Sequence, residues 1–545
     1  MKNTKKNLIK ALSMTTAVFM SAGIITSCGA KDSASMNGGN YRPSNDNTID
    51  GQSEYNYSEE YLNEQPNAEE YAKYTENGYK LVADYPLSTF STDVDTASYA
   101  NIRRMLLNGE TVNPDAVRTE EFINYFNYDY PQPSGEDPVS ITTELSDCPW
   151  NSESKLMLVG LKAEDIEVTE RPPMNLVFLI DVSGSMMDQN KLPLVQQAFA
   201  MLAENLDKND RISIVTYAGE DKVVLEGETG DNYTKITDAL DSLEAGGSTA
   251  GEAGINRAYN IAEEYFIEGG NNRIILATDG DLNVGVSSAE ELTALVEKKR
   301  EGGVYLSVLG FGTGNLKDDR LEALADNGNG NYSYIDSLSE AEKVLVAEMS
   351  GTLYTVAKDV KIQVEFNPLN VAAYRLVGYE NRLLEDEDFT DDKKDAGDMG
   401  AGHSVTALYE IIPVKGVLGS SGSSGIELKY QKNTSSAEVK DTKESGAEIN
   451  QSGELQKELL TVKLRYKSPE KNDSREIQNA VRVDSYTEEM PSNLAFAACA
   501  AKFAMYLKGS EYSDIKPNEI LDTLNKYDLI TDKYREEFAD LAARA

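Results

Sequence analysis

The sequence contains very little histidine, cysteine and tryptophan. There is one histidine, one tryptophan and three cysteines among 545 residues. A single histidine, His403, excludes multi-histidine metal sites and most histidine-based catalysis. The cysteines Cys28, Cys148 and Cys499 are too few and too far apart for a disulfide framework. Cys148 and Cys499 could pair, but buried free thiols fit the sequence at least as well.

Positive charge is also scarce. The chain has 52 basic and 92 acidic residues and a formal net charge of −40. Nucleic acid and anionic lipid surfaces are therefore poor partners. No phosphate-binding G-x-x-x-x-G-K-[ST] motif occurs, and the glycines of Gly310-Phe311-Gly312-Thr313-Gly314 do not follow the dinucleotide-binding pattern. We expect no nucleotide site, and because no catalytic constellation is visible, we expect that the protein is not an enzyme.

Long apolar runs are absent outside the N-terminus. There, lysines precede mostly apolar and small residues over 11–27, which predicts a signal peptide over 1–27. Its end, Ile25-Thr26-Ser27-Cys28, resembles a bacterial lipobox, and that resemblance implies cleavage before Cys28 and lipidation of its thiol. An ordinary signal peptide with an incidental cysteine is the alternative. Residues 28–80 have the composition of a flexible tether.

The remaining chain predicts four regions. Strands and helices alternate over 171–352, which indicates an α/β fold with a doubly wound, mostly parallel sheet. Residues 81–170 predict helices followed by two strands, residues 353–487 predict a β-sandwich-like domain, and 488–545 predict helices with a wide apolar face. The strands before residue 171 and those after 352 could belong to one sandwich, into which the α/β region is inserted.

Two acidic features have plainer explanations than metal binding. Asp93-x-Asp95 stands just before a predicted helix, where Asp commonly caps free N–H groups. The acidic stretch 385–398 does not match the EF-hand loop, and we interpret it as a solvated loop.

One pentapeptide carries the main chemical signal. Asp181-Val182-Ser183-Gly184-Ser185 directly follows the apolar run 175–180, which predicts a buried strand. In open α/β sheets, ligands bind beyond the carboxyl ends of the strands. One carboxylate and two hydroxyls at alternate positions would converge there, and such oxygen ligands suit Mg²⁺ or Ca²⁺ better than zinc or copper. The alternative is that Asp181 and Ser183 only cap the next helix.

Two later segments complete the pattern. Gly246-Gly247-Ser248-Thr249 precedes a helix, and a second buried strand over 273–278 ends in Asp279. The combination resembles the metal-ion-dependent adhesion site (MIDAS) of the von Willebrand factor type A (VWA) family. The resemblance implies that Ser183, Ser185 and Thr249 bind Mg²⁺, or Mn²⁺ or Ca²⁺, and that Asp181 and Asp279 hold it, often through water. A turn at Asp279-Gly280 is the alternative.

The resemblance also implies a function. A MIDAS leaves one metal position open for an Asp or Glu carboxylate of a protein partner. We therefore expect a lipid-anchored, extracytoplasmic protein of the outer membrane or cell surface, with a role in adhesion or as a scaffold. A glycan- or matrix-binding lipoprotein with a structural metal is the alternative, and a metal-assisted hydrolase is a remote one.

Overall fold

The computed structural model describes residues 68–92, 94–165, 171–248, 251–280, 289–348, 354–394, 396–415, 417, 456–469 and 473–545. These residues belong to one compact unit, Glu64–Ala545. The predicted signal peptide, Cys28 and most of the tether lie outside the described residues. Within the described part, no helix combines the length and apolarity needed to span a membrane.

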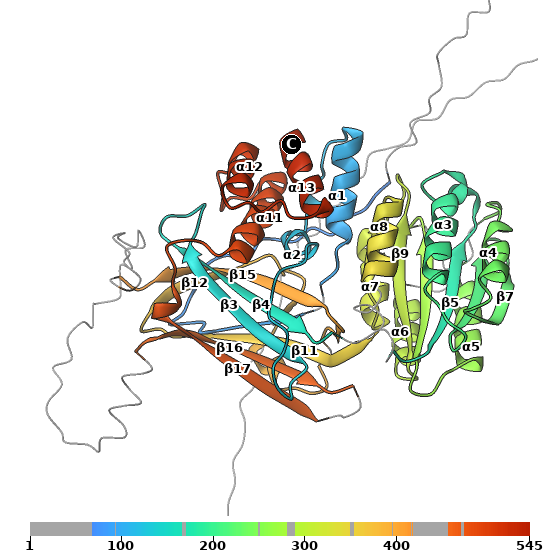
Figure 1. Ribbon diagram of the computed structural model, residues 1–545, viewed down its shortest axis with the longest axis horizontal. Coiled ribbons are helices and arrows are strands. Elements are labelled where there is room, and N and C mark those ends of the chain that lie inside the picture. Colours follow the sequence, from blue (N-terminus) through green and yellow to red (C-terminus); the bar gives the residue numbers. More distant parts are fainter. Residues whose placement is uncertain are drawn as a thin grey trace, which may run out of the picture. The chain divides into compact units, whose positions relative to one another are not determined.

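Six strands form the central sheet of the α/β region, and five of them are parallel. Their order is β10-β9-β8-β5-β6-β7, with β7 antiparallel at one edge. This confirms the predicted fold class (Figure 1). The bounds are β5 (Met174–Asp181), β6 (Arg211–Tyr217), β7 (Asp221–Thr229), β8 (Asn271–Thr278), β9 (Val304–Phe311) and β10 (Tyr332–Ile335).

Helices cover both faces of this sheet because successive residues of each strand face opposite sides. Phe178 of β5 stacks on Phe199 of α3, with ring centroids 4.1 Å apart. Its neighbour Val177 belongs instead to the apolar cluster that contains Ile255 of α5. The first face carries α3 (Leu192–Ala203), α4 (Tyr233–Asp241) and α8 (Leu338–Glu342); the second carries α5 (Gly251–Glu264), α6 (Ala289–Arg300) and α7 (Asp318–Asn327). A π-helix, η4 (Lys343–Ala347), continues α8.

Strands that precede the α/β region in the sequence and strands that follow it together form a β-sandwich. One sheet has the order β1-β12-β15-β4-β3 and the other β13-β2-β11-β16-β17, with β14 paired to β11. The strand β4 (Lys155–Ala163) pairs with β15 (Ser404–Pro413) across the whole α/β region, so that region is an insertion, as hypothesised. The other bounds are β1 (Lys80–Leu81), β2 (Leu87–Ser91), β3 (Val139–Asp147), β11 (Thr355–Phe366), β12 (Val371–Val377), β13 (Leu383–Leu384), β14 (Met399–Gly400), β16 (Glu458–Lys467) and β17 (Ser474–Arg482).

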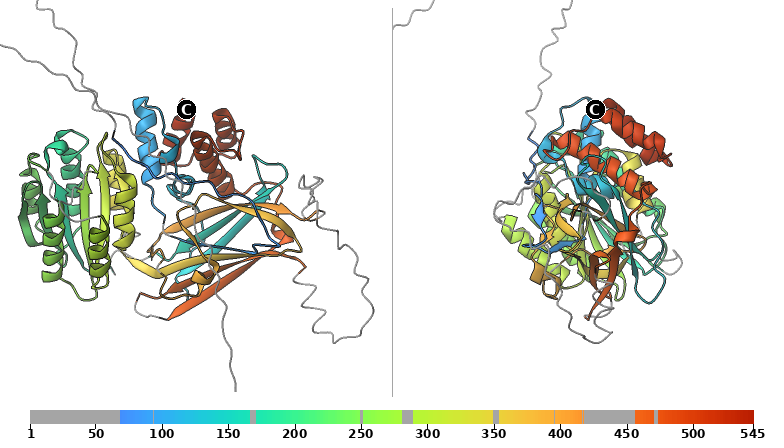
Figure 2. Two further views of the ribbon diagram at one scale, coloured as in Figure 1. Left: turned by 180° about the vertical axis from the view of Figure 1, so that it is seen from behind. Right: turned by 90° about the vertical axis from the view of Figure 1, so that its left-hand side faces the viewer.

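Helices from the two ends of the folded chain form one layer on the sandwich (Figure 2). They are α1 (Ala97–Asn108), α2 (Thr119–Asn124), α11 (Ser492–Lys508), α12 (Pro517–Lys526) and α13 (Lys533–Arg544). The apolar face of α11 is buried against α2 and the β4–β15 sheet, as its pattern predicted. Cys148, directly after β3, and Cys499 of α11 belong to the apolar cluster beneath this layer and are buried free thiols, and burial raises the pKa of each to about 12.

The folded chain begins earlier than predicted. The tether was expected to run to residue 80, but residues 68–71, here called the strap, already contact the α/β region. The Ala68 N–H donates to the Gly314 carbonyl and the Glu70 N–H to the Leu316 carbonyl, each at 2.9 Å. The strap therefore lies along the loop that follows β9.

Candidate metal centre

The first segment of the centre lies at the carboxyl end of β5, as predicted. Asp181 is the last residue of that strand and is fully buried. Its Oδ1 accepts a 2.8 Å hydrogen bond from the Ser183 N–H, and this Asp-centred turn ends the strand. A short 3₁₀ helix, Gly184–Met187, follows at once. The turn brings two hydroxyls together, with Ser183 Oγ 3.0 Å from Ser185 Oγ.

The second segment is fastened to the first by backbone hydrogen bonds. The Gly246 N–H donates to the Val182 carbonyl at 2.7 Å, and the Gly184 N–H donates to the Gly247 carbonyl at 3.1 Å. Gly247 has a φ of +87°, a conformation that favours glycine. These bonds hold the loop that leads to Thr249 against the serine turn. Thr249 itself lies outside the described residues, so its role as a ligand stays a prediction.

The third segment is Asp279, which directly follows β8, the parallel neighbour of β5. Its side chain is buried, and Oδ2 accepts a 3.0 Å hydrogen bond from the Lys191 ammonium. Burial, together with the nearby charge of Asp279, raises the pKa of Asp181 to about 6. The Thr278 hydroxyl lies 3.4 Å from Asp181 Oδ2. The two carboxylates thus belong to one buried cluster behind the serine hydroxyls.

Lys191 is a residue of this cluster that sequence reasoning missed. It stands just before α3 and is buried, and its stem crosses Gly312 at the end of β9. A Cβ at Gly312 would lie 2.3 Å from the Lys191 Cε, so only glycine leaves room for this side chain. The available signal was a lysine directly before a helix, together with two aspartates at the ends of strands. It was overlooked because lysines at helix ends are usually solvated.

The donor set fits a hard divalent cation. Asp181, Asp279 and Ser183 are all buried, and Ser185 is exposed, so the oxygens reach from the interior to the surface at Ser185. Within the described part, no group of three or more His, Cys, Asp or Glu residues could hold a metal. Any ion held here would therefore use hydroxyls besides carboxylates, a choice that favours Mg²⁺, Mn²⁺ or Ca²⁺ over thiophilic metals.

Comparisons with known proteins agree with this geometry. The family model "von Willebrand factor type A domain" matches residues 175–347, and "von Willebrand factor" matches 65–158. The model "Uncharacterized protein YfbK, C-terminal" matches 351–545. The chain is 42% identical over 456 residues to YfbK of Escherichia coli (strain K12), covering 82% of this chain and 75% of that protein. The chain belongs to the YfbK family of VWA-domain proteins.

Other members of the wider VWA group are similar over shorter stretches. Inter-alpha-trypsin inhibitor heavy chain H3 of Homo sapiens is 28% identical over 256 residues, which cover 44% of this chain and 28% of that protein. A solved von Willebrand factor type A protein from Catenulispora acidiphila covers 76% of this chain and 91% of its own, with 14% identity and a TM-score of 0.40. The mussel byssus protein PTMP1, solved with a "zinc occupied MIDAS motif", covers 34% of this chain and 46% of its own, with 21% identity and a TM-score of 0.28.

Proposed function

We propose that this VWA protein binds a protein partner through a divalent cation. The cation, Mg²⁺ in the first place, would be held by Asp181, Ser183, Ser185, Thr249 and Asp279. The observation that carries the proposal is the pair of hydroxyls 3.0 Å apart, one on the buried Ser183 and one on the exposed Ser185, with buried carboxylates behind them. This arrangement exposes one side of the cation and supports it on the other.

The charges around the site favour an anionic ligand. Hydroxyl ligands transfer less charge to a cation than carboxylates do. The Lys191 ammonium, ion-paired to Asp279 at 3.0 Å, offsets one of the two negative charges. A divalent cation here would keep a net positive charge and attract a further oxygen anion. An Asp or Glu side chain of a partner has the required charge and hard oxygen donors.

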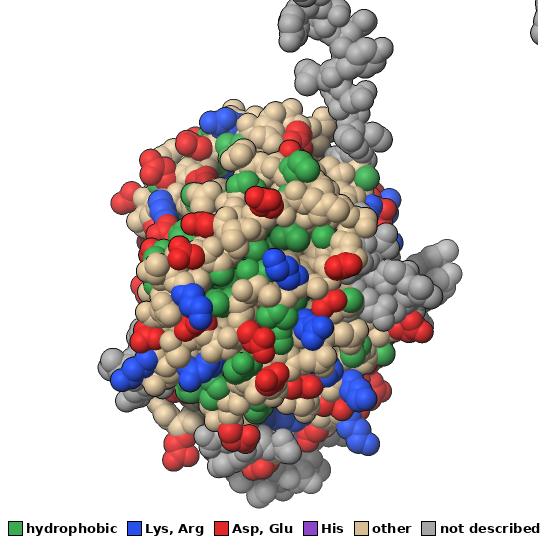
Figure 3. All heavy atoms as spheres, turned by 90° about the vertical axis from the view of Figure 1, so that its right-hand side faces the viewer, with side chains coloured by type: hydrophobic (Ala, Val, Ile, Leu, Met, Phe, Trp, Pro, Cys, Tyr) green, Lys and Arg blue, Asp and Glu red, His purple; other side chains and the backbone are tan. Residues whose placement is uncertain are grey.

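The surroundings favour a protein rather than a small carboxylate. Met187, two residues beyond Ser185, is 64% exposed and is among the most exposed large apolar side chains of the described part. Methionine is enriched in protein interfaces relative to the rest of the protein surface. On the face in Figure 3, acidic and basic side chains are interspersed with apolar ones. The proposal therefore includes an apolar contact around the metal-bound carboxylate.

Binding rather than catalysis is part of the proposal. The ionisable groups at the site, Asp181, Asp279 and Lys191, are all buried. Asp181 accepts a hydrogen bond from the Ser183 N–H, and Lys191 donates one to Asp279. None stands free as a general base beside the hydroxyl pair.

The proposal also includes a location. The lipobox-like Cys28 supports a lipid anchor and a location at the outer membrane or cell surface, where the protein would act in adhesion or as a scaffold.

The test has two stages with one set of variants. Calorimetric titration of Mg²⁺ into the full-length protein should give binding that Ser183→Ala abolishes. Ser242→Ala, which removes an exposed serine hydroxyl at the end of α4, is the matched control. A pull-down from envelope extract should then retain a partner in Mg²⁺ but not in EDTA, and not with Ser183→Ala. A partner retained in all conditions would place recognition outside the metal centre and refute the proposal.

A further inference from the structure

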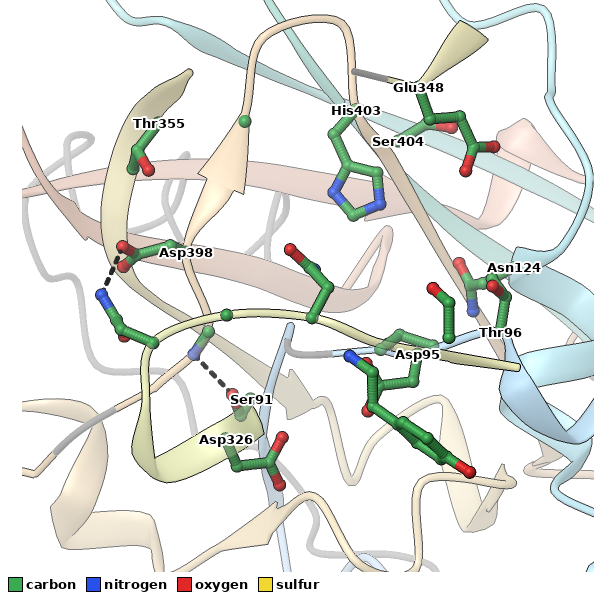
Figure 4. A pocket seen from close by; sticks show the side chains of 18 of the residues that line it. Ser91, Asp95, Thr96, Asn124, Asp326, Glu348, Thr355, Asp398, His403 and Ser404 are labelled. Carbon is green, nitrogen blue, oxygen red and sulfur yellow. Dashed lines mark hydrogen bonds between the residues drawn. The ribbon is translucent and has the colours of Figure 1, made fainter. Parts of the chain in front are cut away.

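A polar cavity of about 610 Å³ lies at the opposite end of the central sheet from the metal centre. Its lining includes Arg273 near the start of β8, the segment 327–333 that leads into β10, and Glu348 after η4. The sandwich contributes Asp398 and His403, and the His403 imidazole points into the cavity (Figure 4). Arg273 and Asp279 stand six residues apart along one extended segment, roughly 20 Å, so the cavity is separate from the metal centre.

Arg273 is unlike the other buried arginines of the described part. It is 3% exposed, forms no ion pair with any described residue, and its Nε has no hydrogen-bond partner there. Its Nη1 donates to Ser307 Oγ at 2.6 Å. The remaining buried arginines each pair with a carboxylate: Arg103, Arg104, Arg118, Arg375 and Arg535. A buried cation without a paired anion is costly, unless a ligand supplies the anion.

The carboxylates that line the cavity are already engaged. Asp95 and Asp326 pair with Arg382, and Glu348 pairs with Lys343. Asp398 accepts hydrogen bonds from the Asn329 side chain at 2.9 Å and from the Asp359 N–H at 3.0 Å. On the remaining wall Lys162 donates to the Gly402 carbonyl and lies 3.9 Å from Asp165. The charge of Asp398 also acts on Arg273 and favours its charged form, but these two described side chains form no ion pair. Arg273 is therefore the lining cation that is left for an incoming anion.

The rest of the lining is suited to hydroxyl groups. A carboxamide and several hydroxyls line the cavity from different elements, those of Asn331, Thr96, Ser333 and Ser404. The Asn124 carboxamide also lines it but is already hydrogen-bonded to Tyr379 and to the Thr406 backbone. Burial lowers the pKa of His403 to about 4, so its neutral imidazole can both donate and accept a hydrogen bond at neutral pH. Burial also lowers the pKa of Arg273, to about 10, which leaves it a cation at neutral pH. The volume is that of a small-molecule site.

We propose that this cavity binds a small polyhydroxylated anion, a sugar acid or a sugar phosphate. The guanidinium of Arg273 would hold the carboxylate or phosphate group. The Asn331 carboxamide, the lining hydroxyls and His403 would bind the sugar hydroxyls. Such a ligand would contact the VWA region and the sandwich at once, because both line the cavity.

The experiment is calorimetric titration of the full-length protein at pH 7 in EDTA, which excludes the metal centre from the result. The probes are glucose 6-phosphate, glucuronate, inorganic phosphate and glucose. We expect glucose 6-phosphate or glucuronate to bind at least tenfold more tightly than inorganic phosphate and glucose. Whichever of the two sugar anions binds more tightly identifies the anionic group, and either result supports the proposal.

Variants locate the binding. Arg273→Gln should weaken binding of the sugar anion by tenfold or more, the effect expected for a charged hydrogen bond. Asn331→Leu, which keeps the size of the side chain, should weaken binding of the sugar anion about fivefold. This second variant tests the cavity even if Arg273→Gln does not fold. Arg257→Gln, at a 51% exposed arginine of α5, should change nothing. The proposal is overturned if no probe binds at millimolar concentration, if glucose binds as tightly as the sugar anions, or if both cavity variants bind normally.

Discussion

The Lys191 ammonium lies 3.0 Å from Oδ2 of Asp279, and both side chains are buried. Replacing Lys191 by Met would leave a buried carboxylate without its cation. Loss of one partner of a buried pair costs about 3–5 kcal/mol. We therefore expect Lys191→Met to lower the free energy of unfolding by about 3 kcal/mol in EDTA, measured by urea denaturation.

The Lys191→Met substitution should also change the affinity for Mg²⁺. The freed Asp279 carboxylate can bind the cation directly, so we expect about tenfold tighter Mg²⁺ binding by calorimetry. Partner binding should weaken, because the cation loses net positive charge. Lys235→Met is the control: Lys235 is 59% exposed and pairs with Glu228, and such surface pairs contribute less than about 1 kcal/mol. Unchanged metal affinity in Lys191→Met would show that Lys191 does not govern the site.

A buried aspartate in α7 should make stability depend on pH. Burial, and next the charge of Glu322, raise the pKa of Asp318 to about 7 from an ordinary 3.8. The folded state therefore binds a proton more tightly than the unfolded chain. The stability contributed by this group is complete below about pH 4 and is lost as the pH rises through about 7.

Asp318→Asn should remove that loss, and Asn still accepts the hydrogen bond from the Tyr332 hydroxyl, now 2.9 Å from Asp318 Oδ1. At pH 8 we expect the variant to be roughly 2–4 kcal/mol more stable than the parent, with a much smaller difference at pH 5. Urea unfolding at the two pH values measures this. The exposed Asp522→Asn serves as control. An equal difference at both pH values would exclude the titration of Asp318 as the cause.

Much of the metal centre could be predicted because its parts are local. Asp181, Ser183 and Ser185 form one turn, and Asp279 ends a neighbouring parallel strand, so pattern and sheet topology suffice to bring them together. Lys191 could not be found in this way. Its burial depends on Gly312, a residue of another strand end whose missing Cβ makes the room.

The interpretation of Asp95 failed because this residue has partners that are distant in sequence. Asp95 was interpreted as a helix cap, but it accepts the Tyr332 N–H at 2.8 Å and pairs with Arg382, more than two hundred residues away in sequence. The acidic stretch 385–398 is mostly exposed, in agreement with its interpretation as solvated, although Asp386 accepts a hydrogen bond from Thr89, and Asp398 from Asn329. Charge runs alone do not show which cations the fold brings to them.

The exposed side chain of Met187 should matter for the partner and not for the metal. Met187→Ser removes apolar surface beside the hydroxyl pair while it leaves Asp181, Ser183 and Ser185 intact. Burial of a Met side chain contributes about 1.5–3 kcal/mol, and partial burial in an interface less. We expect about five- to tenfold weaker partner binding, with unchanged Mg²⁺ affinity and unfolding midpoint. Leu369→Ser, at another exposed apolar residue, should have no effect on either.

The strap should stabilise the loop next to the metal centre. Glu69 accepts a 2.9 Å hydrogen bond from the Gly314 N–H and pairs with Arg104 at 3.1 Å. The loop 314–317 in turn lies directly against Gly280, beside Asp279.

Glu69→Gln keeps the acceptor for the Gly314 N–H but removes the charge from the buried pair with Arg104. We expect the free energy of unfolding to fall by about 2–3 kcal/mol. Amide hydrogen exchange over 314–317 should rise several-fold, because the strap detaches more often. Glu70→Gln is the matched control, since the Glu70 carboxylate pairs with Lys317 and is 56% exposed. If metal affinity also falls in Glu69→Gln and not in Glu70→Gln, attachment of the strap and metal binding are coupled through this loop. Exchange rates that stay unchanged in Glu69→Gln would show that the strap does not support the loop.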